Sequence, residues 1–385
     1  MRKSSNYLFL ILLAMVVLGI WQIRDAVPSF SFMMGGIPAS TGTITPDSPL
    51  WPCYGKGDGP VFPGWRTWIS SVSNEYIQAW LLTYEGKAAE AKSLLERHYE
   101  KTGRAYDLML LGNLALHLGD KEQAVSWWKE AGQTRSLIEQ AKRCQALQQS
   151  GLAQDSYDVA AQVIAPTDGQ GYAELLNYYS QFGNPEQFNL VLQGLLRSEP
   201  NIEESYDMQM LLGKAFGYQN QTQESLKHYQ TALAIKPNDE RAMYEAGRMA
   251  FGLGDYQSAS QYLNDCLRIH HTCRMAEYYL GEIALQHQDY QQAYHWFSLV
   301  EDPLIQLQSL ARVYLLQNNL SEARRLISEA MNYEPDSVKS LTLLASICSA
   351  QQDRACETSA YQKILEVDPG NLTAQSRLKS LQPQP

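Results

Sequence analysis

A helix-pair pattern that returns about every 34 residues constrains this chain more than any other feature. Gly213, Gly247 and Gly281 recur at that interval. Twelve residues after each glycine stands a small residue, and four residues later a bulky one: Ser225, Ala259 and Ala293, then Tyr229, Leu263 and Phe297. A unit of this length cannot bury its own apolar face, so successive copies are expected to stack into a solenoid.

One copy, residues 206–239, shows how such a unit folds. Its apolar residues fall at helical spacing on both sides of a short polar turn, which predicts two antiparallel helices. Pro237 ends the second helix, because proline has no N–H to donate and its ring clashes with the preceding turn. Small residues at Gly213 and Ser225 let the two helices approach closely, and Tyr229 fills the space between this pair and the next.

The pattern resembles the tetratricopeptide repeat family, in which fixed positions are small, aromatic, alanine or proline. Those positions are occupied here by Gly213, Phe216, Ser225, Tyr229, Ala232 and Pro237. Other copies start near Ala105, Glu240, Arg274, Leu304 and Val338, whereas those in residues 72–101, 135–168 and 169–202 are degenerate. The resemblance implies an all-α fold, a right-handed α-α superhelix of about nine helix pairs over residues 69–371. A capping helix and tail are expected at 372–385. In the last copy Glu357 takes a small position, which predicts looser packing there.

The N-terminus predicts a membrane anchor. Arg2 and Lys3 precede a stretch without charged residues at positions 7–21. That length is near the lower limit for a transmembrane helix, so residues 1–24 are interpreted as a cytoplasmic stub and signal anchor. A cleaved signal peptide is the alternative, although Arg24 disfavours cleavage after Ala26. The positive-inside rule places the N-terminus in the cytoplasm and the solenoid on the periplasmic or extracellular side.

Residues 25–68 are rich in proline and glycine and predict an extended linker. Aromatic residues punctuate this segment, among them Trp51, Trp65 and Trp68. Two interpretations stay open. The segment packs along the first repeats or the membrane interface, or it is a dedicated docking segment for a partner.

Charge and motifs exclude several classes of function. The formal net charge is −10 and the isoelectric point about 5.3, which argues against a nucleic-acid partner. The sequence has no zinc-protease motif, nucleophile elbow, phosphate-binding loop or dinucleotide fingerprint. We therefore expect no enzymatic activity and no cofactor.

Six cysteines invite disulfides in an exported chain. Cys348 and Cys356 are the best candidate pair, because they fall on the two helices of the last repeat on either side of a short turn; buried free thiols are the alternative. Cys266 and Cys273 are a weaker pair. His270 and His271 lie between them, but the spacing does not match a structural zinc site, so no metal is expected.

In the resembled family the first helix of each pair lines an inner, concave groove that binds protein or peptide partners. Carrying its register positions over gives these candidate partner-binding residues: Tyr106, Asn113, Asn177, Met210, Lys214, Tyr218, Tyr244, Arg248, Tyr278 and Arg312. Aromatic residues and arginine are enriched at interface centres. Packing between repeats is the alternative role for the tyrosines. The basic residues could meet acidic side chains or a C-terminal carboxylate of a peptide.

The sequence thus predicts a membrane-tethered scaffold or adaptor that binds partner proteins through its concave groove during membrane-complex assembly or envelope biogenesis. A constitutive structural subunit of a membrane complex, and an accessory protein of a carbohydrate or export system, are the alternatives. The identity of the partner and the oligomeric state do not follow from the residues.

Overall fold

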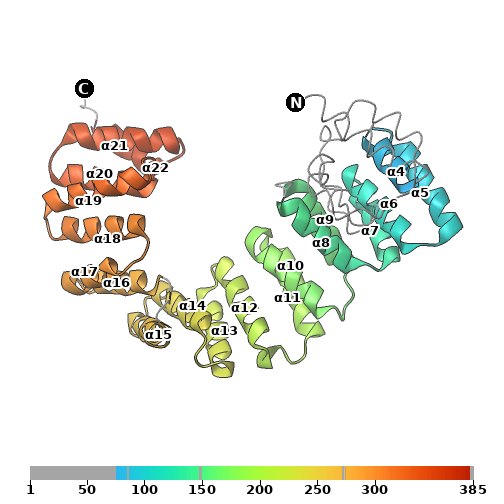
Figure 1. Cartoon of the computed structure of the whole chain (residues 1–385), viewed down its shortest axis with the longest axis horizontal. Coiled ribbons are helices and arrows are strands. Elements are labelled where there is room, and N and C mark those ends of the chain that lie inside the picture. The colour runs from blue at the N-terminus through green and yellow to red at the C-terminus, as the bar shows by residue number, and fades with distance from the viewer. Residues whose placement is uncertain (1–74, 85, 147–149, 271–272, 274, 382–385) are drawn as a thin grey trace, which may run out of the picture. The chain divides into compact units, whose positions relative to one another are not determined.

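The computed structural model describes residues 75–84, 86–146, 150–270, 273 and 275–381. These residues form helices and turns and contain no strand, so the expectation of an all-α chain is confirmed for the part described. The chain divides into two compact units, Met1–Pro200 and Asn201–Pro385. Figure 1 follows the helices of each unit along the chain.

Successive helices form nine antiparallel pairs within the described residues, followed by one further helix. We call the two members of a pair its first and second helix. In the first unit the pairs are α4 (Glu75–Tyr84) with α5 (Ala88–Thr102), α6 (Ala105–His117) with α7 (Lys121–Ala131), α8 (Thr134–Ala146) with α9 (Ser150–Val163), and α10 (Gly169–Phe182) with α11 (Pro185–Ser198). In the second unit they are α12 (Tyr206–Tyr218) with α13 (Thr222–Ile235), α14 (Glu240–Gly252) with α15 (Tyr256–Ile269), α16 (Ala276–Gln286) with α17 (Tyr290–Ser298), α18 (Pro303–Leu316) with α19 (Leu320–Tyr333), and α20 (Val338–Ala350) with α21 (Arg354–Val367). A 3-10 turn, η2 (Ile202–Glu204), precedes α12, and α22 (Leu372–Leu381) follows α21.

The turn inside a pair has the same local structure in several copies. A residue with positive φ ends the first helix, and an Asp or Asn immediately after it caps the second. Gly254 has a φ of 77° and is followed by Asp255, whose carboxylate accepts a hydrogen bond from the backbone N–H of Ser258 at 3.0 Å. Glycine adopts this backbone conformation without strain, and the aspartate satisfies a helix N–H that has no other partner. The turn chemistry therefore fixes where each second helix begins.

Close helix crossings explain the repeating glycines. A Cβ atom added at Gly281 would lie 2.4 Å from Cε1 of Phe297 on the paired helix, and one at Gly213 would lie 2.7 Å from Cε1 of Tyr229. The small partner Ser225 is fully buried and donates a hydrogen bond to the carbonyl oxygen of Gly213 at 2.6 Å. The large ring therefore occupies the space that the glycine leaves.

The degenerate copies are complete helix pairs in the structure. In residues 135–168, α8 and α9 bury Leu137, Ile138 and Tyr157. The copy at 169–202 places Phe188 at a position where the family has alanine, yet the ring is buried. A size exchange nearby accompanies it, because Gly194 on α11 makes room for Tyr172 on α10. Local exchanges of large and small residues conceal the repeat in the sequence without removing the helices.

The last repeat is also well packed, which corrects the expectation of loose packing at Glu357. Its side chain stands in α21 with an exposed fraction of only 6 %. Leu341, Tyr361 and Ile364 form the buried core of this copy, and Leu378 of α22 packs against that core. The glutamate is thus buried within a packed repeat.

The predicted anchor at 1–24 and the predicted linker at 25–68 lie outside the described residues. Within the residues that are described, none of the helices combines the length and the apolar character that a membrane crossing requires.

Candidate partner-binding face

The ten residues predicted to bind a partner all stand on first helices. We call the surface formed by these positions the first-helix face, and treat each unit separately. Tyr106 and Asn113 lie on α6, Asn177 on α10, Met210, Lys214 and Tyr218 on α12, Tyr244 and Arg248 on α14, Tyr278 on α16, and Arg312 on α18.

In the first unit these positions are engaged within the fold. Tyr106 is half-buried and packs against the core between α5 and α6. Asn113 has an exposed fraction of 3 %, and its side-chain oxygen accepts a hydrogen bond from Nε2 of Gln140 at 2.9 Å. Asn177 is half-buried, and its backbone oxygen accepts a hydrogen bond from the Ser180 hydroxyl at 3.0 Å. This side of the unit consequently offers a partner little of the predicted chemistry.

Helix α12 presents the most accessible of the predicted side chains. Tyr218 stands at its C-terminal end with an exposed fraction of 50 %. The Lys214 ammonium lies 5.6 Å from the centre of the Tyr218 ring, within range of a cation–π interaction. Met210, at an exposed fraction of 9 %, belongs to the core below them. The face at α12 is therefore an exposed aromatic ring with a basic group beside it.

The predicted residues of α14 make contacts inside the chain. The Tyr244 ring meets the Tyr279 ring of α16 edge-on, with centroids 6.1 Å apart. Burial raises the pKa of the Tyr244 hydroxyl. Arg248 forms an ion pair with Glu245 on the same helix, with Nη2 and Oε2 separated by 2.7 Å. Tyr244 therefore packs between neighbouring repeats, which is the alternative role that the sequence left open for the tyrosines.

A charged cluster joins the first helices α16, α18 and α20. Arg312 donates a short hydrogen bond to Oε2 of Glu282, whose exposed fraction is 8 %. The Lys339 ammonium lies 5.6 Å from the centre of the Tyr278 ring. Burial is the main reason that the pKa of Tyr278 is raised to about 12, and the Glu282 carboxylate is the second. Arg312 therefore pairs with a nearly buried carboxylate whose charge also acts on Lys339.

Burial opposes protonation of Lys339. Burial of the ammonium is the main reason that its pKa is lowered; Glu282 acts in the opposite direction, and Arg312 lowers it further. Nε of Arg312 is buried and has no hydrogen-bond acceptor among the described residues. The sequence-based list omitted Lys339, although its place as the second residue of the copy starting at Val338 would have found it.

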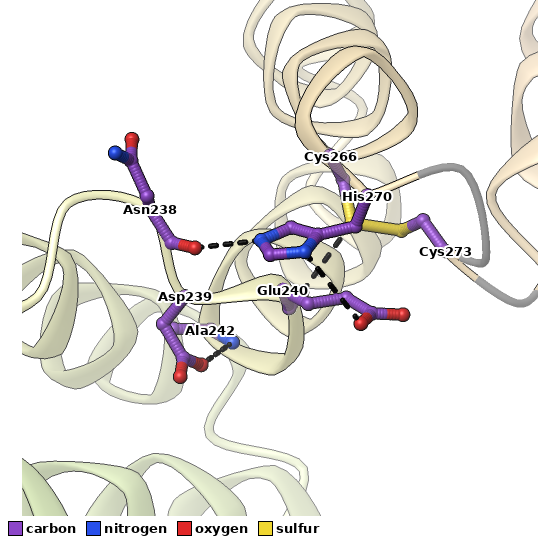
Figure 2. Close-up of a disulfide and its surroundings, with 7 residues drawn as sticks. All are labelled: Asn238, Asp239, Glu240, Ala242, Cys266, His270 and Cys273. Atoms are coloured by element: carbon purple, nitrogen blue, oxygen red, sulfur yellow. Dashed lines mark hydrogen bonds and ion pairs between the residues drawn. A yellow bond between two sulfur atoms is a disulfide. The ribbon is translucent and has the colours of Figure 1, made fainter.

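Two disulfides lie within the second unit. The structure joins Cys348 with Cys356, and also Cys266 with Cys273, the pair that the sequence made the weaker candidate. Figure 2 shows the Cys266–Cys273 bond beside the His270 ring, between the end of α15 and the connection to α16. His270 Nε2 donates to the backbone oxygen of Asn238 at 2.7 Å, and Nδ1 lies 4.0 Å from Oε2 of Glu240.

Through these contacts His270 connects the end of α15 to the start of α14. The other predicted histidine, His271, lies outside the described residues. Among the residues that the structure does describe, no three His, Cys, Asp or Glu side chains come together as metal ligands would.

Comparison with known proteins identifies the repeat. Residues 210–270 match the model of the tetratricopeptide repeat family. No curated protein sequence matches the chain. A tetratricopeptide repeat protein from Parabacteroides merdae has a similar structure, with 16 % identity over 64 % of this chain and 98 % of that one, and a TM-score of 0.53.

Two further structures are similar over smaller parts of the chain. PilF from Pseudomonas aeruginosa shares 21 % identity over 55 % of this chain and 97 % of its own, with a TM-score of 0.42. PilW, a type IV pilus biogenesis factor, shares 16 % identity over 55 % of this chain and 98 % of its own, with a TM-score of 0.46.

The family match and the geometry of the helix pairs agree. The register of glycine, small residue and large residue runs through α12 to α15, which is the region that the family model covers. The Parabacteroides structure extends the same all-helical fold over most of the chain. Residues 210–270 therefore carry tetratricopeptide repeats, within an all-helical fold of the same type.

Proposed function

We propose that this chain is a membrane-tethered scaffold that binds partner proteins through the first-helix face of its second unit. The fold is that of a protein-interaction scaffold, and the comparisons indicate no catalytic family. Such a protein works by holding partners at high local concentration rather than by reaction chemistry.

The observation that carries the proposal is the Lys214–Tyr218 pair on α12, whose tyrosine is exposed, together with the Tyr278–Lys339 contact between α16 and α20. Tyrosine buries a large amphipathic surface at a low cost in conformational entropy, which is why it is enriched in binding hot spots. Both lysines lie on aromatic rings, where they can meet acidic or carbonyl groups of a partner. Arg248 and Arg312 form ion pairs with Glu245 and Glu282, and we assign them to shaping the face.

Tethering and orientation are part of the same proposal. The uncharged stretch at 7–21, preceded by Arg2 and Lys3, supports an N-terminal anchor with the repeats on the non-cytoplasmic side. Resistance of the full chain to carbonate extraction, with an intact Met1 in its mass spectrum, is the expected result. Release by carbonate, or a mature N-terminus beyond residue 24, would refute the anchor. A role in membrane-complex assembly or envelope biogenesis follows if the partners are envelope proteins.

The test of the binding face compares variants that differ in the helix they alter. Partners are crosslinked and captured from native membranes with wild type, with Lys214→Glu/Tyr218→Ala, and with the control Lys227→Glu on second helix α13. Loss of a hot-spot contact of about 2 kcal/mol weakens binding roughly 30-fold. We expect the α12 double variant to lose partners that wild type and the α13 control retain. Equal capture by all three would refute the assignment of the face.

A further inference from the structure

A cleft in the second unit lies apart from the side chains on which the proposed binding face rests. It encloses about 630 Å³ and is lined by α15, α16 and α17. None of the ten predicted partner-binding residues lines it. Its volume falls within the range of ligand pockets in proteins.

The floor of the cleft is apolar. Leu280, Ile283 and Ala284 of α16 form it between α15 and α17. Its sides come from the N-terminal ends of α15 and α17, where Asp255 and Asp289 stand.

Aromatic rings from three helix ends stand around this floor. Tyr256 lies in the first turn of α15, and Trp296 lies in the last turn of α17; both are half-buried. His287, just after α16, meets the Tyr256 ring edge-on with centroids 5.8 Å apart. The faces of tryptophan and tyrosine attract cations, tryptophan most strongly.

The charged side chains that line the cleft are both acidic. Asp255 and Asp289 cap α15 and α17, each accepting a backbone N–H through Oδ1 at 3.0 Å, and no lysine or arginine is among the lining residues. Each full negative charge exceeds the partial positive charge of the helix end that it caps, which is about half a unit. Hydrogen bonds from Ser258 lower the pKa of Asp255, so its carboxylate is ionised at neutral pH. The cleft therefore disfavours anions.

We propose that this cleft binds an arginine side chain of a partner protein. A guanidinium group is planar and stacks on aromatic rings, and its several N–H donors match carboxylate and amide oxygens. The methylene stem of arginine lies well on an apolar floor such as that of α16. Gln257, Asn264 and Gln292 line the same cleft and offer side-chain oxygens to the remaining donors. This inference rests on the proposed function only in taking the guest from a partner protein, because it uses a different face.

The test measures binding of two short peptides to the full chain by calorimetry. One is acetyl-Gly-Arg-Gly amide, and the other carries citrulline, which has the shape of arginine without its charge. We expect the arginine peptide to bind at least about tenfold more tightly than the citrulline peptide, as a desolvated cation over an aromatic ring beside two carboxylates requires. Equal affinity of the two peptides, or no binding of either, would overturn the proposal.

Variants separate the charge from the fold. Asp255→Asn/Asp289→Asn removes both charges, and asparagine caps helices about as well as aspartate, so folding is retained. Asp353→Asn at the cap of α21 is the matched control, since it does not line the cleft. The cleft double variant should lose the preference for arginine while the control keeps it; an unchanged preference contradicts the assignment. Lys214→Glu/Tyr218→Ala should leave arginine binding unaltered, so that failure of the α12 face and failure of the cleft are distinguishable.

Discussion

Replacing Gly281 with alanine probes the close helix crossing that the copies around Gly213, Gly247 and Gly281 share. In an ordinary helix this change stabilises, because glycine is about 1 kcal/mol less favourable than alanine in a helix interior. At Gly281 the new methyl group would lie 2.4 Å from Cε1 and 2.6 Å from Cδ1 of Phe297. Atoms at those distances overlap, so a shift of the ring or the helix is required.

The size of the effect follows from what can move. Phe297 is fully buried among the side chains of α16 to α18, so its ring has no open space to enter. Forcing an extra methyl group into a well-packed core costs about 1–3 kcal/mol. Subtracting the gain in helix propensity leaves a net destabilisation of about 0–2 kcal/mol, and the overlap at 2.4 Å places Gly281→Ala toward the upper end of that range.

Gly252 supplies the matched control within the same unit. It ends helix α14, is exposed, and an added Cβ would make only an ordinary contact at 3.5 Å with Thr222 Cγ2. Urea unfolding followed by circular dichroism, with hydrogen exchange of the α16 and α17 amides, measures both variants. We expect Gly281→Ala to lower the midpoint and Gly252→Ala to leave it unchanged or raise it. A Gly281→Ala chain as stable as the control would refute the close crossing of α16 and α17.

Three further predictions concern the polar and covalent contacts of the second unit. The half-buried His228 ring stacks on Phe216 and is bonded to Gln209 at 2.8 Å, and partial burial lowers its pKa. The unfolded chain therefore binds a proton first, and stability should fall as the pH drops below about 6.5. His228→Gln should reduce that loss in urea titrations at pH 5 and 7. Glu282→Gln removes the carboxylate that pairs with Arg312 and should cost about 1–3 kcal/mol in the same assay. The cost is less than for a fully buried pair, because Arg312 is partly exposed to solvent. An unchanged stability would show that the pair is not formed. Cys266→Ser/Cys273→Ser opens a small loop and should cost roughly 2–3 kcal/mol under oxidising conditions. The difference between wild type and variant should disappear when both are measured in reductant.

The regular repeats were predictable from the sequence because they depend on local rules. Spacing alone located the first and second helices around Gly213, Gly247 and Gly281, and the residues at each turn marked where the second helix begins. The degenerate copies were harder to recognise, because compensation occurs between residues that are distant in the repeat register. Tyr172 and Gly194 exchange sizes across the α10–α11 interface, and neither residue stands at a position that the repeat pattern specifies.

The helices that carry the candidate residues were predictable from the sequence, but the contacts of those residues were not. Register placed the ten residues on first helices, but only the structure shows that Asn113 is bonded to Gln140 and that Arg312 is bonded to Glu282. Pairings of this kind depend on side-chain geometry across neighbouring repeats, which spacing does not encode. The cleft between α15 and α17 was not predicted at all, because its lining comes from three helices whose side chains meet only in the folded chain.

Site-specific photocrosslinking tests the central claim most directly. A benzophenone amino acid is placed at Tyr218, on the exposed end of first helix α12, and in parallel at Lys227, on the exposed surface of second helix α13. The full chain is irradiated in native membranes, and the adducts are identified by mass spectrometry. The proposed scaffold predicts a discrete protein adduct from position 218 that Lys214→Glu abolishes, and none of the same mass from position 227. Adducts of equal yield from both positions, or an adduct from position 218 that Lys214→Glu leaves unchanged, would contradict it.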